Sequence, residues 1–190
     1  MKYPTGIKQQ TKKVTNYGNR GMSLEEDINI TNAYYREQDI AVIYKKPTPI
    51  TITKVDYPNR KEAVIKEAYF KTPSTTDYNG IYREKYIDFE AKETKQNRFP
   101  LSNIHAHQIT HMKQIIRHGG IGFFIIRFTQ KNETYLLEGK TLFEFIERET
   151  RKSIPYTYIQ EKGYRISEKL NPRIDYLTWI DKICFEGGKS

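Results

Sequence analysis

The sequence has little sulfur and no long apolar run. Its 190 residues include a single cysteine, Cys184, which excludes an internal disulfide and a zinc site built from cysteines and is typical of a reducing compartment. No stretch reaches the roughly 20 apolar residues that cross a bilayer, and no apolar segment of the kind found in secretory signals follows the N-terminal lysine. We therefore expect a cytoplasmic protein without a membrane partner, about the size of one domain.

Acidic residues are absent from residues 1–20. This segment carries five Lys and Arg side chains among mostly Thr, Gln, Asn, Gly and Pro residues. Such a composition cannot build a core, so the sequence predicts a flexible basic N-terminal arm over 1–20, followed by a main domain over 21–190.

Positive charge exceeds negative charge along the whole chain. Thirty-two Lys and Arg residues against 23 Asp and Glu residues give a formal net charge of +9, which favours an anionic partner and nucleic acid above all. A second basic stretch, residues 45–71, has aromatic rings between its charges, and such groups can contact phosphates and stack on bases. The alternative is that both stretches are ordinary solvated surface. The residues expected at DNA are Lys12, Lys13, Arg20, Lys54, Arg60, Lys61, Lys66, Tyr69 and Lys71.

The apolar periodicity predicts helices and strands in alternation. Ser23 and Glu26 form a capping-box pattern at the start of the first helix, and Asn103 is expected to cap the second. Helices are expected at 23–38, 103–118, 142–148 and 174–185, and strands at 40–44, 50–55, 86–92, 121–128 and 134–137. We expect the strand at 40–44 to be buried, because its apolar run is continuous. The order of elements predicts an α/β domain with a mixed sheet flanked by helices.

Residues 47–76 are expected to project from this domain as a stalk. Pro47 and Pro49 interrupt the preceding strand pattern, and the segment has few residues that must face the main core. Its 63–70 portion fits a strand or a helix equally well.

The sharpest chemical pattern is formed by Asp77, Glu90 and Lys92. On an extended strand, Glu90 and Lys92 project from the same face, and the turn after Asp77 can bring that carboxylate beside them. Two carboxylates can bind Mg²⁺ through oxygen, and an ammonium group can stabilise charge on a phosphodiester. A solvated charged strand face is the structural alternative.

Longer motifs around these residues resemble a known family. Residues 20–25 resemble the RGxxxE that opens archaeal junction resolvases of the PD-(D/E)xK nuclease superfamily. The chain is more closely similar to the RecU Holliday junction resolvases of Gram-positive bacteria, from about residue 16 onward. The motifs that carry this resemblance lie at 19–22, 72–80, 86–94, 99–101 and 105–108.

The resemblance implies a restriction-endonuclease-like core with a projecting stalk. By similarity, Thr75, Asp77, Glu90 and Gln108 would hold Mg²⁺, for which Mn²⁺ would substitute. Lys92 would stabilise the transition state, and Glu25 would support the site, so the expected catalytic residues are Lys92, Glu25, Asp77 and Glu90.

The implied activity is that of an endodeoxyribonuclease in recombinational DNA repair. The family acts as a homodimer that nicks symmetric strands of a four-way junction, and its products would carry 5′-phosphate ends. A recombinase and a branch-migration complex are the expected protein partners. Two alternatives remain: a non-catalytic basic DNA-binding or architectural protein that modulates a recombinase, and a nuclease that cuts linear duplexes as readily as junctions.

Overall fold

The computed structural model describes residues 22–59, 62–71 and 75–186. The N-terminal arm predicted for 1–20 therefore lies outside the described residues. So do five of the residues expected at DNA: Lys12, Lys13, Arg20, Arg60 and Lys61.

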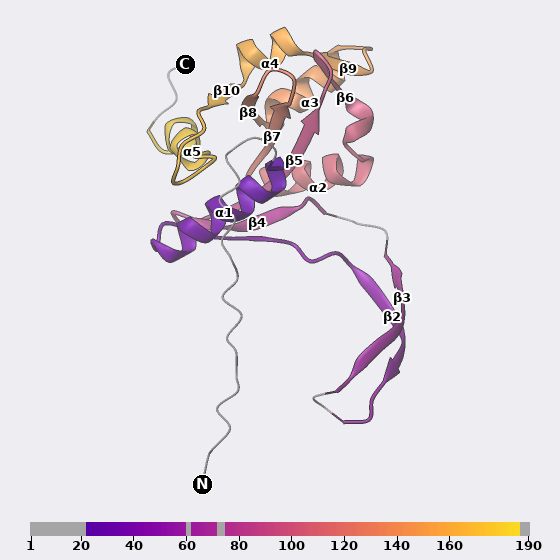
Figure 1. The fold of residues 1–190 in the computed structure, drawn as a ribbon. Helices are drawn as coiled ribbons and strands as arrows, with labels where there is room; N and C mark the ends of the chain where they lie inside the picture. The colour runs from indigo at the N-terminus through magenta and orange to yellow at the C-terminus, as the bar shows by residue number, and fades with distance from the viewer. Residues whose placement is uncertain (1–21, 60–61, 72–74, 187–190) are drawn as a thin grey trace.

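A six-stranded mixed sheet forms the centre of the fold (Figure 1). Its strand order is β1-β4-β5-β7-β8-β10, in which β5 and β7 run parallel and the other neighbours run antiparallel. These strands are β1 (Val42–Lys45), β4 (Tyr78–Tyr82), β5 (Lys85–Thr94), β7 (Ile121–Phe128), β8 (Glu133–Glu138) and β10 (Tyr164–Ile166). The sheet confirms the predicted α/β class.

Helices cover both faces of the sheet and bury two aromatic-rich cores. The core beneath α1 and α5 centres on stacked Phe89 and Phe123 rings, whose centroids are 4.7 Å apart. The opposite core, beneath α2, α3 and α4, centres on Phe124 and Phe128. The helices are α1 (Leu24–Glu37), α2 (Ala106–Arg117), α3 (Gly139–Arg148), α4 (Tyr156–Lys162) and α5 (Leu177–Cys184). A 3₁₀ turn, η1 (Leu101–Asn103), and a small sheet of β6 (Arg98–Pro100) and β9 (Ser153–Pro155) complete the second side.

The stalk is a two-stranded ribbon that reaches away from the sheet (Figure 1). Its strands, β2 (Ile50–Asp56) and β3 (Val64–Phe70), pair antiparallel, and every residue in both is exposed. The structure thus makes the 63–70 portion a strand, which the sequence pattern alone left open.

Two details of the sequence prediction are wrong. The apolar run at 40–44 is not a buried strand: β1 lies at the edge of the sheet, where Ile43 is buried and Val42 and Tyr44 are 53% and 55% exposed. Asn103 does not cap the second helix, because it belongs to η1 and α2 begins after His105. Continuous apolar runs do not distinguish edge strands from central ones, since an edge strand can also present apolar side chains to solvent.

The first helix begins as its sequence predicts. The Ser23 hydroxyl accepts a hydrogen bond from the Glu26 backbone N–H, and the Glu26 carboxylate accepts one from the Ser23 N–H. This capping box fixes the first turn of α1, and with it the position of Glu25.

The strand register leaves part of β5 open at one edge. The pairing of β4 with β5 begins with Tyr78 opposite Phe89, because the chain before Tyr78 comes from the stalk. Within the described residues, β5 therefore has no β4 partner beyond Phe89, although it still pairs with β7 as far as Thr94. Glu90 and Lys92 lie on this open part of β5, and Asp77 directly precedes β4.

Candidate active site at the open edge of β5

Asp77, Glu90 and Lys92 meet at the open edge of β5. The Asp77 backbone N–H donates to Glu90 Oε2 over 3.1 Å. The Lys92 ammonium forms an ion pair with Glu90 Oε1 and lies 3.8 Å from Asp77 Oδ2. Glu90 and Lys92 face α2, because the alternation of β5 turns Phe89 into the opposite core. The structure thus brings together the three residues of the sharpest sequence pattern.

The first turn of α1 places Glu25 beside Asp77 and Lys92, in a pocket that Glu90 does not line. Glu25, Asp77 and Lys92 line one pocket of about 400 Å³ between α1, β4 and β5. Burial raises the pKa of the neighbouring Tyr78 hydroxyl, and the negative charges of Glu25, Asp77 and Glu90 raise it further. One phenol therefore lies within the field of all three carboxylates. Glu25 is 56% exposed at its side chain and forms an ion pair with Lys45.

The Glu90 carboxyl is held in an environment that disfavours its charge. Its side chain is fully buried, whereas the Asp77 side chain is 43% exposed. Burial, and then the interaction with the Asp77 side-chain carboxyl, raises the pKa of Glu90 to about 8, although the Lys92 ammonium opposes the shift. An additional positive charge beside this carboxyl would therefore favour its ionised form.

The oxygen atoms of this site fit a hard divalent cation. Glu90 Oε1 is buried without a hydrogen-bond partner, and the Lys92 ammonium is its ion-pair neighbour. A second carboxylate, that of Asp77, is adjacent and partly open to solvent. Among the described residues no three His, Cys, Asp or Glu side chains form a metal cluster, and the two carboxylates available at this edge are those of Asp77 and Glu90. Mg²⁺ is typically bound in this way, through one or two carboxylates and several waters.

Thr75 and Gln108, the two other residues implied as metal ligands, each form a hydrogen bond within the protein. Thr75 lies two residues before Asp77, and its hydroxyl donates to the Thr76 carbonyl oxygen at 3.3 Å. Gln108 is buried on α2, where its side-chain oxygen accepts a hydrogen bond from the His105 N–H at 2.9 Å. That bond closes the first turn of α2, so the Gln108 oxygen already has a partner in this structure.

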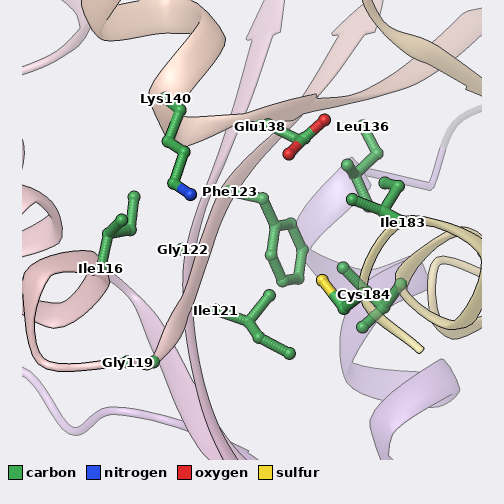
Figure 2. A pocket seen from close by; sticks show the side chains of 12 residues that line it. Ile116, Gly119, Ile121, Gly122, Phe123, Leu136, Glu138, Lys140, Ile183 and Cys184 are labelled. Atoms are coloured by element: carbon green, nitrogen blue, oxygen red, sulfur yellow. The ribbon is translucent and has the colours of Figure 1, made fainter. Parts of the chain in front are cut away.

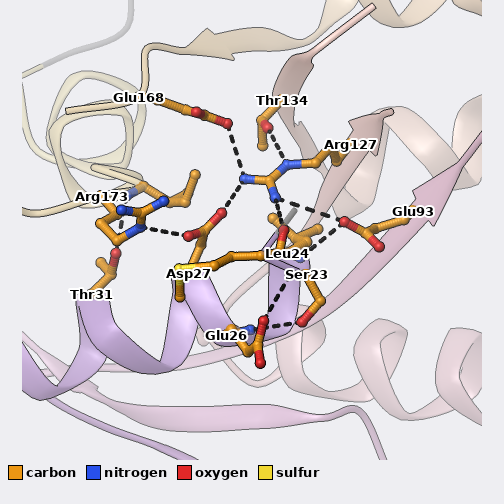
Figure 3. Close-up of polar contacts among 12 residues, drawn as sticks. Ser23, Leu24, Glu26, Asp27, Thr31, Glu93, Arg127, Thr134, Glu168 and Arg173 are labelled. Atoms are coloured by element: carbon orange, nitrogen blue, oxygen red, sulfur yellow. Dashed lines mark hydrogen bonds and ion pairs between the residues drawn. The ribbon is translucent and has the colours of Figure 1, made fainter. Parts of the chain in front are cut away.

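A buried ion-pair network anchors the first turn of α1 (Figure 3). Arg127 on β7 contacts Asp27 at 2.7 Å and Glu168 at 3.1 Å, and also donates to Thr134. Glu93 of β5 accepts a hydrogen bond from the Leu24 N–H at 2.9 Å. The network joins the helix that carries Glu25 to the strand that carries Glu90, which fixes their relative positions.

A further buried carboxylate, Asp88, was not assigned a separate role from the sequence. Its oxygens contact Lys46 and Thr76, which lie at the two ends of the stalk, and Tyr86 and His111 also lie within hydrogen-bonding distance. The alternation of β5 predicts that Asp88 shares a face with Glu90, but the sequence holds no signal that brings Lys46 or Thr76 to it. Burial, and then the charges of His105 and Lys92, lower the pKa of His107 on α2.

The described stalk residues expected at DNA are on the surface. Lys54 and Lys66 have side chains 65% and 53% exposed, in loose ion pairs with Glu67 and Asp56. Tyr69 is 66% exposed, and Lys71 at the base of the ribbon is also exposed. These side chains are free to reach a partner that approaches the ribbon.

A second pocket lies between β7, β8 and α5 (Figure 2). It has a volume of about 210 Å³, and Phe123 and Ile183 form much of its apolar wall, with Glu138 and Lys140 as its charged groups. Asp77, Glu90 and Lys92 are not among its lining residues.

No helix in the described part of the chain combines the length and the apolar character that crossing a membrane requires.

Comparison with known proteins identifies the family. The family model of Recombination protein U, RecU, matches residues 19–182. The chain belongs to the RecU family. A curated relative from Geobacillus sp. (strain WCH70), named Holliday junction resolvase RecU, is 57% identical over 97% of this chain and 98% of its own length. A relative of the same name from Bacillus cytotoxicus is 54% identical over the same shares of both chains.

The similarity to a solved structure is lower than the similarity to these relatives. Archaeoglobus fulgidus Hjc, described as a Holliday junction resolvase from an archaeal hyperthermophile, aligns with this RecU-family chain at a TM-score of 0.46 and 12% identity. The alignment covers 75% of this chain and 93% of that one.

Proposed function

We propose that this RecU-family chain is an endonuclease that resolves Holliday junctions in recombinational DNA repair. The observation that carries the proposal is the meeting of Asp77, Glu90 and Lys92 at an open strand edge. Relatives that share more than half of its residues over almost their full length are named as resolvases of such junctions.

Asp77 and Glu90 would hold Mg²⁺, or Mn²⁺ in its place, with Thr75 and Gln108 as further ligands. The ion would supply positive charge beside the scissile phosphate and lower the pKa of a water molecule that attacks it. Support for Asp77 and Glu90 comes from their adjacent oxygens, one of which is buried without a hydrogen bond. For Gln108 to join them, its side chain must leave the His105 N–H.

Lys92 and Glu25 would support catalysis beside Asp77 and Glu90. The Lys92 side chain is 24% exposed, so its ammonium can face the substrate phosphate and stabilise the negative charge that develops there. Glu25 lines the same pocket from α1 and can orient a water molecule through its exposed carboxylate. Attack of water at phosphorus with departure of the 3′-oxygen, which breaks the P–O3′ bond and takes up a proton, would leave a 5′-phosphate and a 3′-hydroxyl end.

Selection of a four-way junction would depend on shape. A homodimer carrying two such sites at a fixed separation nicks symmetric strands in pairs, and phosphate contacts from the N-terminal arm and the stalk provide affinity. The exposed Lys54, Lys66, Tyr69 and Lys71 are the described residues that support this part of the proposal. We expect the protein to act in the cytoplasm, with a recombinase and a branch-migration complex as partners.

The test compares a labelled four-way junction with a linear duplex of matched sequence. Wild-type protein should nick the junction in pairs with Mg²⁺ and leave it intact with EDTA, while the duplex stays whole. Glu90→Gln and Asp77→Asn should abolish cleavage and retain junction binding, because each removes charge from the metal site and leaves the basic surface unchanged.

Glu147→Gln is the matched control. Glu147 pairs with Lys113 on the outer surface of α2 and α3, so its loss removes one carboxylate charge away from β5 and should leave cleavage unchanged. Tight junction binding by wild-type protein without scission under either condition would instead indicate an architectural DNA-binding protein.

A further inference from the structure

The two ends of the stalk converge on one buried carboxylate. Lys46 is the residue before the stalk and Thr76 is the last residue of the stalk, and both side chains contact Asp88 of β5. Lys46 Nζ lies 2.7 Å from Asp88 Oδ2 and 3.0 Å from Thr76 Oγ1, and the Thr76 hydroxyl donates to Asp88 Oδ1. The three side chains form a closed triangle of polar contacts.

The Asp88 carboxylate is buried and surrounded by polar partners. Its side chain is fully buried, and a buried carboxylate is costly unless hydrogen bonds and a cation compensate it. Tyr86 donates to Oδ2 at 3.2 Å from the same strand, and His111 of α2 approaches it at 3.3 Å. Lys46 supplies the ion pair of 2.7 Å, so the segment that leads into the stalk brings a compensating cation to Asp88 on β5.

The triangle lies close to the proposed metal site along both segments, one residue before Asp77 and two residues before Glu90. Thr76 directly precedes Asp77, whose N–H bonds to Glu90, and Asp88 shares its strand face with Glu90 two residues later. The backbone adds a further link, because the Lys46 N–H donates to the Asp77 carbonyl oxygen at 2.7 Å. A displacement of the stalk base therefore reaches the Asp77 peptide through both its side-chain and its main-chain contacts.

We propose that Lys46, Thr76 and Asp88 form a clamp that positions Asp77 against Glu90 and so links the placement of the stalk to divalent-ion binding. The ion-binding half of this inference rests on the function proposed above. The three are positioning residues, since they act through Asp77 and Glu90. A stalk that is deflected by DNA would alter the separation of the two carboxylates, and a stalk seated as in this structure would hold them together.

The experiment uses Thr76→Val, Thr76→Ser and Lys46→Met in the full-length chain. Thr76→Val keeps the shape and removes the hydroxyl donor, while Thr76→Ser restores it. Lys113→Met is the matched control, because its ion pair with Glu147 is also 2.7 Å long but lies on the outer surface. Protection of the Phe124 amide in β7 reports whether each variant keeps its fold.

The first readout needs no metal. Hydrogen exchange of the Asp77 amide, followed by NMR with EDTA present, should become about tenfold faster in Thr76→Val and Lys46→Met, as expected for loss of one buried hydrogen bond. Exchange should stay at the wild-type rate in Thr76→Ser and Lys113→Met. Unchanged Asp77 exchange in Thr76→Val, with Phe124 still protected, would overturn the clamp.

The second readout is the affinity for Mn²⁺ by calorimetry. Thr76→Val and Lys46→Met should bind Mn²⁺ about tenfold more weakly than wild type, the usual effect of losing a side chain that orients a metal ligand, and Thr76→Ser should bind within about twofold of wild type. Equal affinity in Thr76→Val and wild type would overturn the link to ion binding. A wild-type chain that binds no Mn²⁺ would overturn the proposed metal site, and the exchange rates would still decide whether the clamp positions Asp77.

Discussion

Replacing Glu90 with glutamine should stabilise the metal-free protein at alkaline pH. Burial, and then the interaction with the Asp77 side-chain carboxyl, raises the pKa of Glu90 from 4.5 to about 8. In the unfolded chain the carboxyl ionises near its ordinary pKa, so the folded state holds a proton that the unfolded state releases. The free energy of unfolding therefore falls as the pH rises from about 4.5 to about 8, and Glu90→Gln removes this loss.

The size of the effect follows from that pKa interval. Each pH unit between the two pKa values is worth about 1.4 kcal/mol, which sets a ceiling of about 5 kcal/mol at pH above 8. Lys92 stays beside the ionised carboxylate, and water can enter the 400 Å³ pocket next to it, so relaxation reduces the penalty. We expect Glu90→Gln to be more stable by about 2 kcal/mol at pH 8.5 and equal to wild type at pH 4.

Urea unfolding with EDTA, at one protein concentration and at several pH values, measures this difference. Glu147→Gln serves as the control, because the Lys113 hydrogen bond lowers the pKa of the exposed Glu147, and its loss should not stabilise the protein at any pH. Mg²⁺ should reduce the difference in the free energy of unfolding between wild type and Glu90→Gln, since a bound cation favours the ionised carboxylate. A variant no more stable than wild type at pH 8.5, or equally stabilised at pH 4, would refute the reasoning.

Four further perturbations test other parts of the structure. Arg127→Met should lower the free energy of unfolding by about 3 kcal/mol in urea titrations, because Asp27 loses a buried partner; a change under about 1 kcal/mol would mean that the network is not needed for stability. Gly80→Ala should cost about 2 to 3 kcal/mol in the same assay, since its Cβ would lie 2.1 Å from the Val42 carbonyl oxygen; wild-type stability would contradict that close approach. Removal of residues 1–16 should flatten the salt dependence of junction binding by about 0.9 in log–log slope per lost phosphate contact, and an unchanged slope would exclude the N-terminal arm from DNA. Replacing residues 48–74 with a short linker should remove the preference for junctions over duplexes in cleavage assays and leave the circular dichroism spectrum of the main domain intact, whereas an unfolded product would place the stalk in the core.

Local signals in the sequence predict much of the fold. Ser23 and Glu26 mark the start of α1, and the alternation around Glu90 correctly gives β5 its two faces. These features depend on neighbours within a few residues, which a single sequence displays directly. The edge position of β1 could not be predicted in this way, because it depends on the order in which distant strands pair.

In the candidate site, too, features set by nearby residues can be predicted from the sequence, and contacts between distant segments cannot. The spacing of Glu90 and Lys92 on one strand predicts their shared face, and the turn after Asp77 allows it to return beside them. The contacts of Asp88 with Lys46 and Thr76 span 42 and 12 residues of sequence, and no periodicity reports contacts of that kind. Charge alternation also does not reveal that the Glu90 face is covered by α2, so its burial and its raised pKa become visible only in three dimensions.

The parallel pairing of β5 with β7 has a consequence for the order of folding. The hairpins β4–β5 and β7–β8 join strands that are close in sequence, whereas β5 and β7 are linked through α2 and a long connection. Contacts between segments far apart in the chain form slowly, because loop-closure entropy opposes them before they are stabilised. Glu90 lies opposite Phe124 on this seam, so we expect the nuclease site to be assembled in a late step. A chain in which β5 has not yet paired with β7 would therefore lack the assembled site.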